Sequence, residues 1–258
     1  MPGIDGYHEV PSDAQQEADL KQLSQGGESV KLKVQYTDAS GASRGVTIDY
    51  NIRGPGFNFA SVDLAALDAI SASWWLHNKY QDNLERGGDL RVRNVDGAEV
   101  FFYNDIQTGS PGQADRRGSR MSTESAVDFV ISGNAVAVWH IHPPGGSAIK
   151  VLNQAYTDSR LNENFSSGDI ERSKAYADPT TKGAKRYFEA NDRAPPSRTV
   201  RLPEYLGNNV GEIIYNPNLW DSGARGSITI NPVFNQSTTQ RPSTSYTMGK
   251  FDALLSGK

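Results

Sequence analysis

The feature that most constrains the fold is the run Ala135–His142 (AVAVWHIH), which is apolar except for its two histidines. A short, continuous apolar run with β-branched and aromatic residues is typical of a buried strand. The turn sequence Pro143–Gly146 follows it and is expected to end the strand. Because side chains two positions apart on a strand point the same way, His140 and His142 are predicted to face one side of the sheet.

Shorter alternating runs predict further strands. Residues 29–52 contain two such runs around a Gly/Ser turn, and this pattern predicts a β-hairpin. Residues 89–104 predict a second hairpin, which turns at Asp96-Gly97. A third hairpin is expected within residues 205–217, and a short strand within residues 227–234.

One long stretch has helical spacing. Apolar residues repeat every three to four positions from Ser61 to Glu85, which predicts an amphipathic helix. Ser61 or Asp63 is the expected N-cap, because both side chains can accept a hydrogen bond from the first helical turn. The pair Gly87-Gly88 is expected to stop the helix.

The stretch after the histidines is predicted to be irregular before it becomes helical. Residues 143–165 show only weak helical character, around residues 150–156. Ser166 is then the expected N-cap of a helix that runs to Ala177. This helix would carry Asp169 in its first turn.

Composition narrows the class of protein. The chain has 258 residues, no cysteine and a net charge of −4. The lack of cysteine excludes disulfides, thiolate metal ligands and a cysteine nucleophile. Scattered Lys and Arg on a slightly acidic chain argue against a nucleic-acid partner. No apolar run approaches the roughly 20 residues of a membrane span, and no secretory signal pattern begins the sequence.

We therefore expect one α+β domain in which helices flank a mixed sheet. The predicted divisions are an N-terminal extension with a β-hairpin (1–58), a core domain (59–220) and a polar C-terminal extension (221–258). The sequence shows no internal repeat and no clean linker that would favour a further division.

Two histidines and one later acid make a candidate metal site. Without cysteine, a zinc ion must be held by imidazole nitrogen and carboxylate oxygen, and a catalytic zinc keeps one position for water. His140, His142 and Asp169 meet this requirement. Metal-dependent hydrolase barrels and cupins need further histidines downstream, whereas His8 and His77 both lie upstream. An HNH nuclease would favour a basic surface.

The segment His140-Ile141-His142-Pro143, followed by Ser166-Ser167-Gly168-Asp169, resembles the His-x-His-Pro…Ser-x-x-Asp signature of the JAB/JAMM (MPN+) metalloproteases. Glu85-Arg86-Gly87-Gly88 stands where that family carries its upstream glutamate. The chain is most similar to the JAB-like domains of RHS-associated and other polymorphic bacterial toxins. Their later Tyr-Leu-Gly…Gly-x-Ile stretch is matched within residues 205–213. The resemblance spans about residues 60–217 and implies a JAB/MPN-like fold for them.

The chain departs from the family pattern in its spacing. Asp169 follows His142 by 27 positions (142 to 169), well over twice the gap of the eukaryotic enzymes, and an insertion over residues 146–164 would account for this. The upstream acid also has a rival in Glu99. We prefer Glu85 because the two glycines follow it.

The resemblance implies that His140, His142 and Asp169 hold Zn²⁺, with Glu85 as general base and Ser166 as an oxyanion donor. It further implies hydrolysis of a peptide or isopeptide bond in a peptide or protein substrate. The chain would then be a secreted toxin or effector domain, delivered into a target cell, with an immunity protein that covers the cleft. The alternatives are a JAB-fold binding module or a toxin that acts through a partner without peptidase activity, a metal-dependent toxin of another chemistry at the same site, and a plain cytoplasmic protein.

Overall fold

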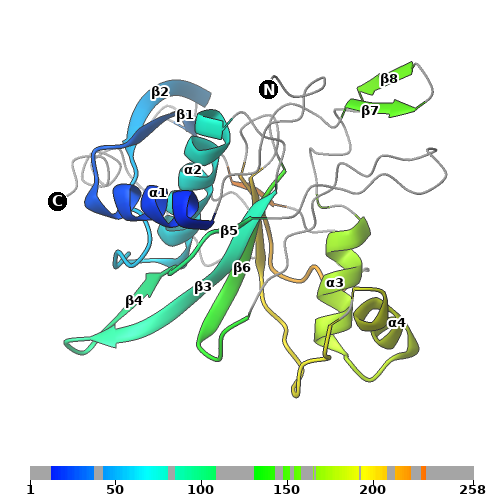
Figure 1. Ribbon diagram of the computed structural model, residues 1–258. Helices are drawn as coiled ribbons and strands as arrows, with labels where there is room; N and C mark the ends of the chain where they lie inside the picture. The colour runs from blue at the N-terminus through cyan, green and yellow to red at the C-terminus, as the bar shows by residue number, and fades with distance from the viewer. Residues whose placement is uncertain are drawn as a thin grey trace.

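The structure is a computed structural model. It describes residues 13–37, 43–80, 85–108, 131–142, 148–151, 154–157, 165, 167–191, 193–207, 213–221 and 228–230. Its centre is a seven-stranded mixed sheet with the order β11-β10-β9-β6-β3-β4, in which β5 also pairs with β3 (Figure 1). These strands are β3 (Arg86–Val95), β4 (Ala98–Phe102), β5 (Gln107–Thr108), β6 (Ala135–Ile141), β9 (Glu204–Gly207), β10 (Ile213–Asn216) and β11 (Ile228–Ile230).

The strand predicted at Ala135–His142 is confirmed, and it lies inside the sheet. It pairs antiparallel with β3 on one side and parallel with β9 on the other. Residues 137–141 are all buried. A strand that is enclosed on both edges and covered on both faces needs the continuous apolar character that this segment has.

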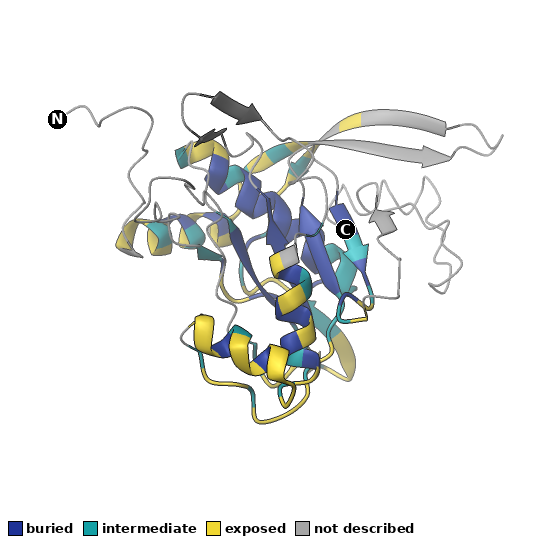
Figure 2. Cartoon of the chain, turned by 90° about the vertical axis from the view of Figure 1, so that its right-hand side faces the viewer, coloured by how far each residue is buried: buried dark blue, intermediate teal, exposed yellow. Residues whose placement is uncertain are grey.

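Helices cover the two faces of the sheet. Helix α2 (Val62–Tyr80) lies on one face, and α3 (Ser167–Ala177) lies with α4 (Lys182–Ala190) on the other (Figure 1). Side chains of β6 alternate between these layers. Trp139 and Ile141 join the main hydrophobic core with α2, whereas His140 points towards α3. Figure 2 shows α2 buried along most of its length, while α4 exposes much of its surface.

The start of α2 is as predicted, but the role of the two glycines is not. The Ser61 hydroxyl accepts a hydrogen bond from the Leu64 N–H at 3.3 Å, as an N-cap does. Gly87 and Gly88 do not stop the helix; they lie in β3. A Cβ at Gly88 would stand 3.3 Å from the Asp105 carbonyl oxygen. A small residue is therefore needed in the strand itself, where the backbone comes close to its neighbours.

The N-terminal hairpin is confirmed and packs on the same core. β1 (Ser29–Thr37) pairs antiparallel with β2 (Ser43–Asn51), and a helix, α1 (Asp13–Gln25), precedes them. Leu23 and Ile52 belong to the buried cluster that contains α2. The expected extension thus contributes to the core, and the boundary at residue 58 stays a prediction. Residues 231–258 lie outside the described residues.

The other hairpins are also confirmed. β3 and β4 are joined by Asp96 and Gly97, which have φ values of 51° and 85°. Two successive residues with positive φ are typical of the tight turn that suits the strand twist. β9 and β10 form the antiparallel pair expected within residues 205–217, and β11 continues the sheet.

The weak helical prediction for residues 150–156 is wrong. Residues 148–151 and 154–157 form a two-stranded hairpin, β7–β8 (Ala148–Val151 and Gln154–Thr157). Its sequence contains Ile149, Val151 and Tyr156, and such β-branched and aromatic residues favour strands. The α+β class and the mixed sheet with flanking helices are confirmed. None of the described helices is both long and apolar enough to cross a bilayer.

Candidate metal centre

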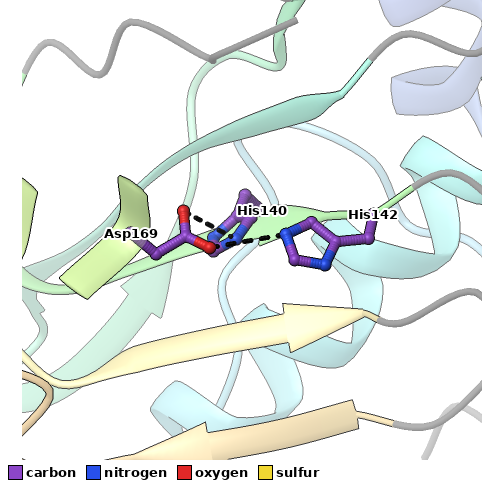
Figure 3. Close-up of side chains that lie close together, drawn as sticks. All are labelled: His140, His142 and Asp169. Carbon is purple, nitrogen blue, oxygen red and sulfur yellow. Dashed lines mark ion pairs between the residues drawn. The ribbon is translucent and has the colours of Figure 1, made fainter. Parts of the chain in front are cut away.

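The two histidines lie at the carboxyl end of β6, on the face that α3 covers. His140 is the last residue but one of the strand, and His142 follows the strand's end. The His142 N–H nevertheless donates to the Gly207 carbonyl at 2.8 Å, so hydrogen bonding to the end of β9 fixes its backbone. Both imidazoles are buried, and their ring centroids are 5.1 Å apart (Figure 3).

Asp169 completes the group from the first turn of α3. Its Oδ1 lies 3.3 Å from Nε2 of His140, and its Oδ2 lies 3.4 Å from Nε2 of His142 (Figure 3). One ligand atom from each of the three residues lies within 4.8 Å of the others, and all three residues are buried. The fold therefore places side by side the three residues that the sequence predicted as metal ligands.

This arrangement fits a metal ion. Zinc bonds to His nitrogen and carboxylate oxygen are about 2.0–2.2 Å long, so two ligand atoms of a tetrahedral site stand about 3.4 Å apart. The distances of 3.3 Å from Oδ1 to His140 and 3.4 Å from Oδ2 to His142 are of this order, and each runs from a different oxygen of Asp169. A tetrahedral ion held by these three side chains would keep one position for a further ligand.

The charge states of the ligands suit a cation as well. Burial lowers the pKa of His140 to about 4, against the opposing effect of Asp169, so this imidazole is neutral near pH 7. Burial alone would raise the pKa of Asp169. The neighbouring His140 and Arg172, with hydrogen bonds from both histidines, instead hold it well below its usual value. Metal ions require this combination of neutral imidazole and ionised carboxylate.

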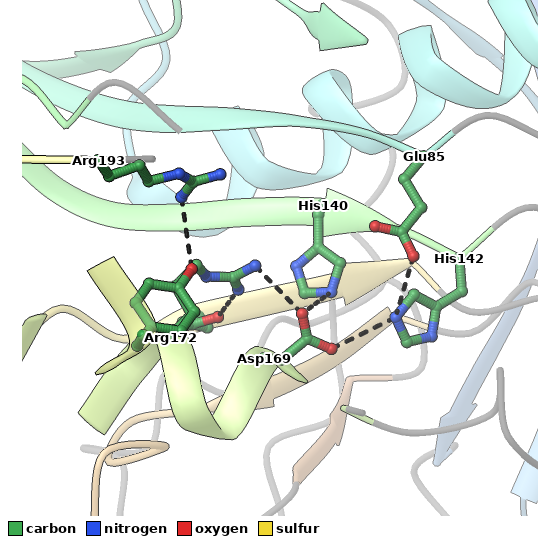
Figure 4. Close-up of polar contacts among 8 residues, drawn as sticks. Glu85, His140, His142, Asp169, Arg172 and Arg193 are labelled. Carbon is green, nitrogen blue, oxygen red and sulfur yellow. Dashed lines mark hydrogen bonds and ion pairs between the residues drawn. The ribbon is translucent and has the colours of Figure 1, made fainter. Parts of the chain in front are cut away.

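Glu85 lies beside this group. It directly precedes β3. Arg86 pairs with Ile141 in the antiparallel ladder, so the next position along the ladder places Glu85 opposite His142. Its Oε1 is 4.0 Å from the His142 Nε2 (Figure 4). The Glu85 side chain is 15% exposed, against 6% or less for the three candidate ligands, so it is the one of the four with the most contact with solvent.

The rival acid, Glu99, is far from the histidines. It is an exposed residue of β4, paired with Asn94 near the turn of the hairpin. His140 pairs with Gly87, seven positions along β3 from Asn94, a separation of roughly 23 Å at the usual rise of a strand. Of the two acids, the fold brings only Glu85 to the candidate site.

Ser166 lies outside the described residues, so its predicted role stays a prediction. Phe165, directly before it, has its ring centroid 5.8 Å from that of His140. The chain that leads into α3 thus passes close to the candidate ligands.

Two further charged residues at the site escaped the sequence prediction. Arg172 donates to Asp169 Oδ1 at 3.1 Å (Figure 4) and to Glu204 Oε2 at 2.7 Å, and all three side chains are buried. Arg172 could have been found, since it lies three positions after Asp169 on one helix face. Glu204 has no local signal, because only the pairing of β9 with β6 brings it here.

Comparison of the chain with protein-family models, with curated proteins and with solved structures gave no match. The chemistry of the site has to be inferred from its own geometry.

Proposed function

We propose that this chain is a zinc-dependent hydrolase with a JAB/MPN-like fold, which cleaves a peptide or isopeptide bond. The observation that carries the proposal is the buried group of His140, His142 and Asp169, with the Glu85 carboxylate at its edge. The order of elements supports it too. The glutamate precedes one strand, the two histidines end the neighbouring strand, and the aspartate opens a helix on the same face.

The ligand set favours zinc over calcium and magnesium. Calcium and magnesium prefer six or more oxygen ligands or several retained waters, whereas this group offers two nitrogens and one carboxylate. Three protein ligands with one position left open are typical of catalytic zinc. We therefore take Zn²⁺ as the resident ion of the proposed enzyme.

The roles of the side chains follow from their positions. A bound zinc ion supplies Lewis acidity, which lowers the pKa of water at the site and polarises a carbonyl group. Glu85 would accept a proton from the attacking water and pass it to the leaving amine. Its short distance to His142 and its partial exposure support this role. His140 and His142 would hold the ion.

Two conservative substitutions test the assignment of the general base. Glu85→Gln should retain zinc and the fold, because the amide keeps the shape of the side chain, but it should lower hydrolysis by about 10²–10⁴-fold. Glu99→Gln is the matched control and should leave the rate unchanged. The rate is measured with a quenched fluorescent peptide library and with isopeptide-linked ubiquitin dimers. If both variants cleave as fast as the wild type, Glu85 is not the base.

For the biological role we propose a toxin or secreted effector domain, restrained by an immunity protein that covers the metal site. The resemblance to toxin-associated JAB domains supports this role. Expression of the wild-type chain in the cytoplasm or periplasm of a susceptible bacterium should inhibit growth, and His142→Ala should relieve the inhibition. Equal inhibition by both would favour a binding module that acts without catalysis.

A further inference from the structure

We infer that Arg172 and Glu204 form a buried charged brace that positions Asp169 for metal binding. The brace is the chain of contacts from Glu204 through Arg172 to Asp169, and Figure 4 shows its contact between Arg172 and Asp169. This inference rests on the proposed metal site, and it assigns both residues a positioning role, since neither contacts a substrate or the ion.

The brace joins the same two parts of the fold that supply the ligands. Asp169 and Arg172 belong to α3, whereas Glu204 is the first residue of β9, which pairs in parallel with β6. The histidines come from the end of β6. The ion pair between Arg172 and Glu204 therefore sets the position of the helix-borne ligand relative to the strand that carries the other two.

The geometry also fixes how the Asp169 carboxylate is turned. Its Oδ1 receives Arg172 at 3.1 Å and lies 3.3 Å from His140, while its Oδ2 faces His142 at 3.4 Å. Because a guanidinium group is planar and rigid, a hydrogen bond from it limits the rotation of the carboxylate. Each oxygen is thereby held towards one histidine. Outer partners of this kind are known to tune metal affinity.

Glu204 is needed for the balance of charge. A single Arg172 cation beside Asp169 would cancel the negative charge that a metal ion requires. Glu204, ion-paired with Arg172 at 2.7 Å, returns one negative charge to the group. With both carboxylates ionised, the set of Asp169, Arg172 and Glu204 carries a net charge of −1. Ser173 also donates a hydrogen bond to Glu204, so the acid is held on more than one side.

A purely structural ion pair is the competing explanation, and a double substitution separates the two. In Arg172→Met/Glu204→Gln both charges of the pair are removed together, so the net charge of the group stays at −1, while Asp169 loses its contact with Arg172. Denaturant unfolding of the metal-free variant beside the wild type measures any change in stability separately from the change in zinc affinity. The zinc dissociation constant of the variant should rise by about 10–100-fold, as for the loss of outer partners of metal ligands.

Cobalt supplies a second readout, because the visible absorption of Co²⁺ reports the arrangement of its ligands. The double variant should show a changed Co²⁺ spectrum, since Asp169 is no longer held. The control is Lys79→Met/Asp19→Asn, which removes another ion pair with a buried carboxylate (2.6 Å) away from the histidines. That control should leave both the zinc dissociation constant and the Co²⁺ spectrum unchanged.

The outcomes distinguish this inference from the function on which it rests. If the wild type binds zinc and the double variant matches it in affinity and spectrum, the brace is overturned while the metal site stands. If the wild type itself binds no zinc, both fail. Should the double variant not fold, Glu204→Gln alone is measured in the same way. A zinc dissociation constant at least about 10-fold weaker supports the brace, and an unchanged one overturns it.

Discussion

Asp68 and Asp169 are both buried aspartates, and they lie on opposite faces of the same sheet. Asp68 belongs to α2 and Asp169 to α3, the two helical layers in Figure 1. Burial disfavours the charged form of any carboxylate, so each must be compensated by its surroundings. The two surroundings are of different kinds.

Four hydrogen-bond donors surround Asp68, two at each oxygen. Oδ1 receives the Tyr50 hydroxyl and the Arg53 N–H at 2.9 Å and 2.8 Å. Oδ2 receives the Gly54 N–H and the Tyr103 hydroxyl at 2.9 Å and 2.7 Å. Burial still raises its pKa above the usual value, although these hydrogen bonds act against it. Through these hydrogen bonds Asp68 connects α2 to residues 50–54 and to Tyr103.

The surroundings of Asp169 include a full positive charge and two imidazole nitrogens, and its pKa is lowered rather than raised. A neutral imidazole carries a lone pair on one ring nitrogen that can bind a cation, whereas a backbone N–H has none. The contrast indicates that protein donors satisfy the hydrogen bonding of Asp68, whereas Asp169 and its two histidines are suited to share a metal ion.

The largest expected effect on stability is at Asp68. Asp68→Ala leaves two hydroxyls and two N–H groups buried without their acceptor, which costs about 1–3 kcal/mol for each group. We expect the free energy of unfolding to fall by roughly 4 kcal/mol or more. The control is Asp49→Ala, which removes an exposed ion pair with Lys31 and should cost less than about 1 kcal/mol. Zinc content should not change in either variant, and a loss of zinc in Asp68→Ala would break the contrast.

At Asp169 we expect a larger effect on zinc binding than on the stability of the metal-free protein. Asp169→Asn should weaken zinc binding by at least about 100-fold, or about 2.7 kcal/mol, because a charged ligand is lost. The metal-free protein should lose less stability than Asp68→Ala does, since Arg172 keeps Glu204 as its partner. Zinc titration and denaturant unfolding measure the two quantities. A variant that binds zinc as the wild type does would contradict the contrast.

The lowered pKa of His140 should make the stability of the metal-free protein depend on pH. Its pKa is about 4 when folded, below the usual 6.5, so the unfolded chain binds a proton that the folded chain does not. Protonation of His140 in the unfolded chain therefore lowers the free energy of unfolding by about 3 kcal/mol as the pH falls from 6.5 towards 4, and it has no such effect above pH 6.5. Asp68 and Glu204 act in the opposite sense, because their pKa values are raised mainly by burial. The measurement is therefore the difference in unfolding free energy between wild type and His140→Gln with a chelator present. A difference that does not change with pH would contradict a neutral, buried His140.

The sequence predicted those parts of the site that depend on local spacing. His140 and His142 share a face because side chains two apart on a strand do so, and Asp169 lies in a first helical turn. It did not predict Glu204, because a parallel pairing of distant strands has no local pattern. The two glycines after Glu85 were also ambiguous, since glycine ends helices and equally permits close contacts within strands.

Helix α4 was missed although its signals are present. Thr181 caps it by accepting from the Ala184 N–H, and Ala184 and Phe188 are buried four positions apart. The segment is only nine residues long, so its amphipathic pattern has few repeats along the sequence. Its stability depends on packing against α3, through the contact of Phe188 with Tyr176.

The metal content of the purified protein tests the central claim most directly. The chain is purified without added metal, and zinc is counted by elemental analysis beside His140→Ala/His142→Ala, with circular dichroism to verify that both fold. We predict one zinc ion per chain in the wild type and none in the double variant. Equal zinc in the two proteins, or no zinc in a folded wild type that is then titrated with Zn²⁺, would contradict the metal centre.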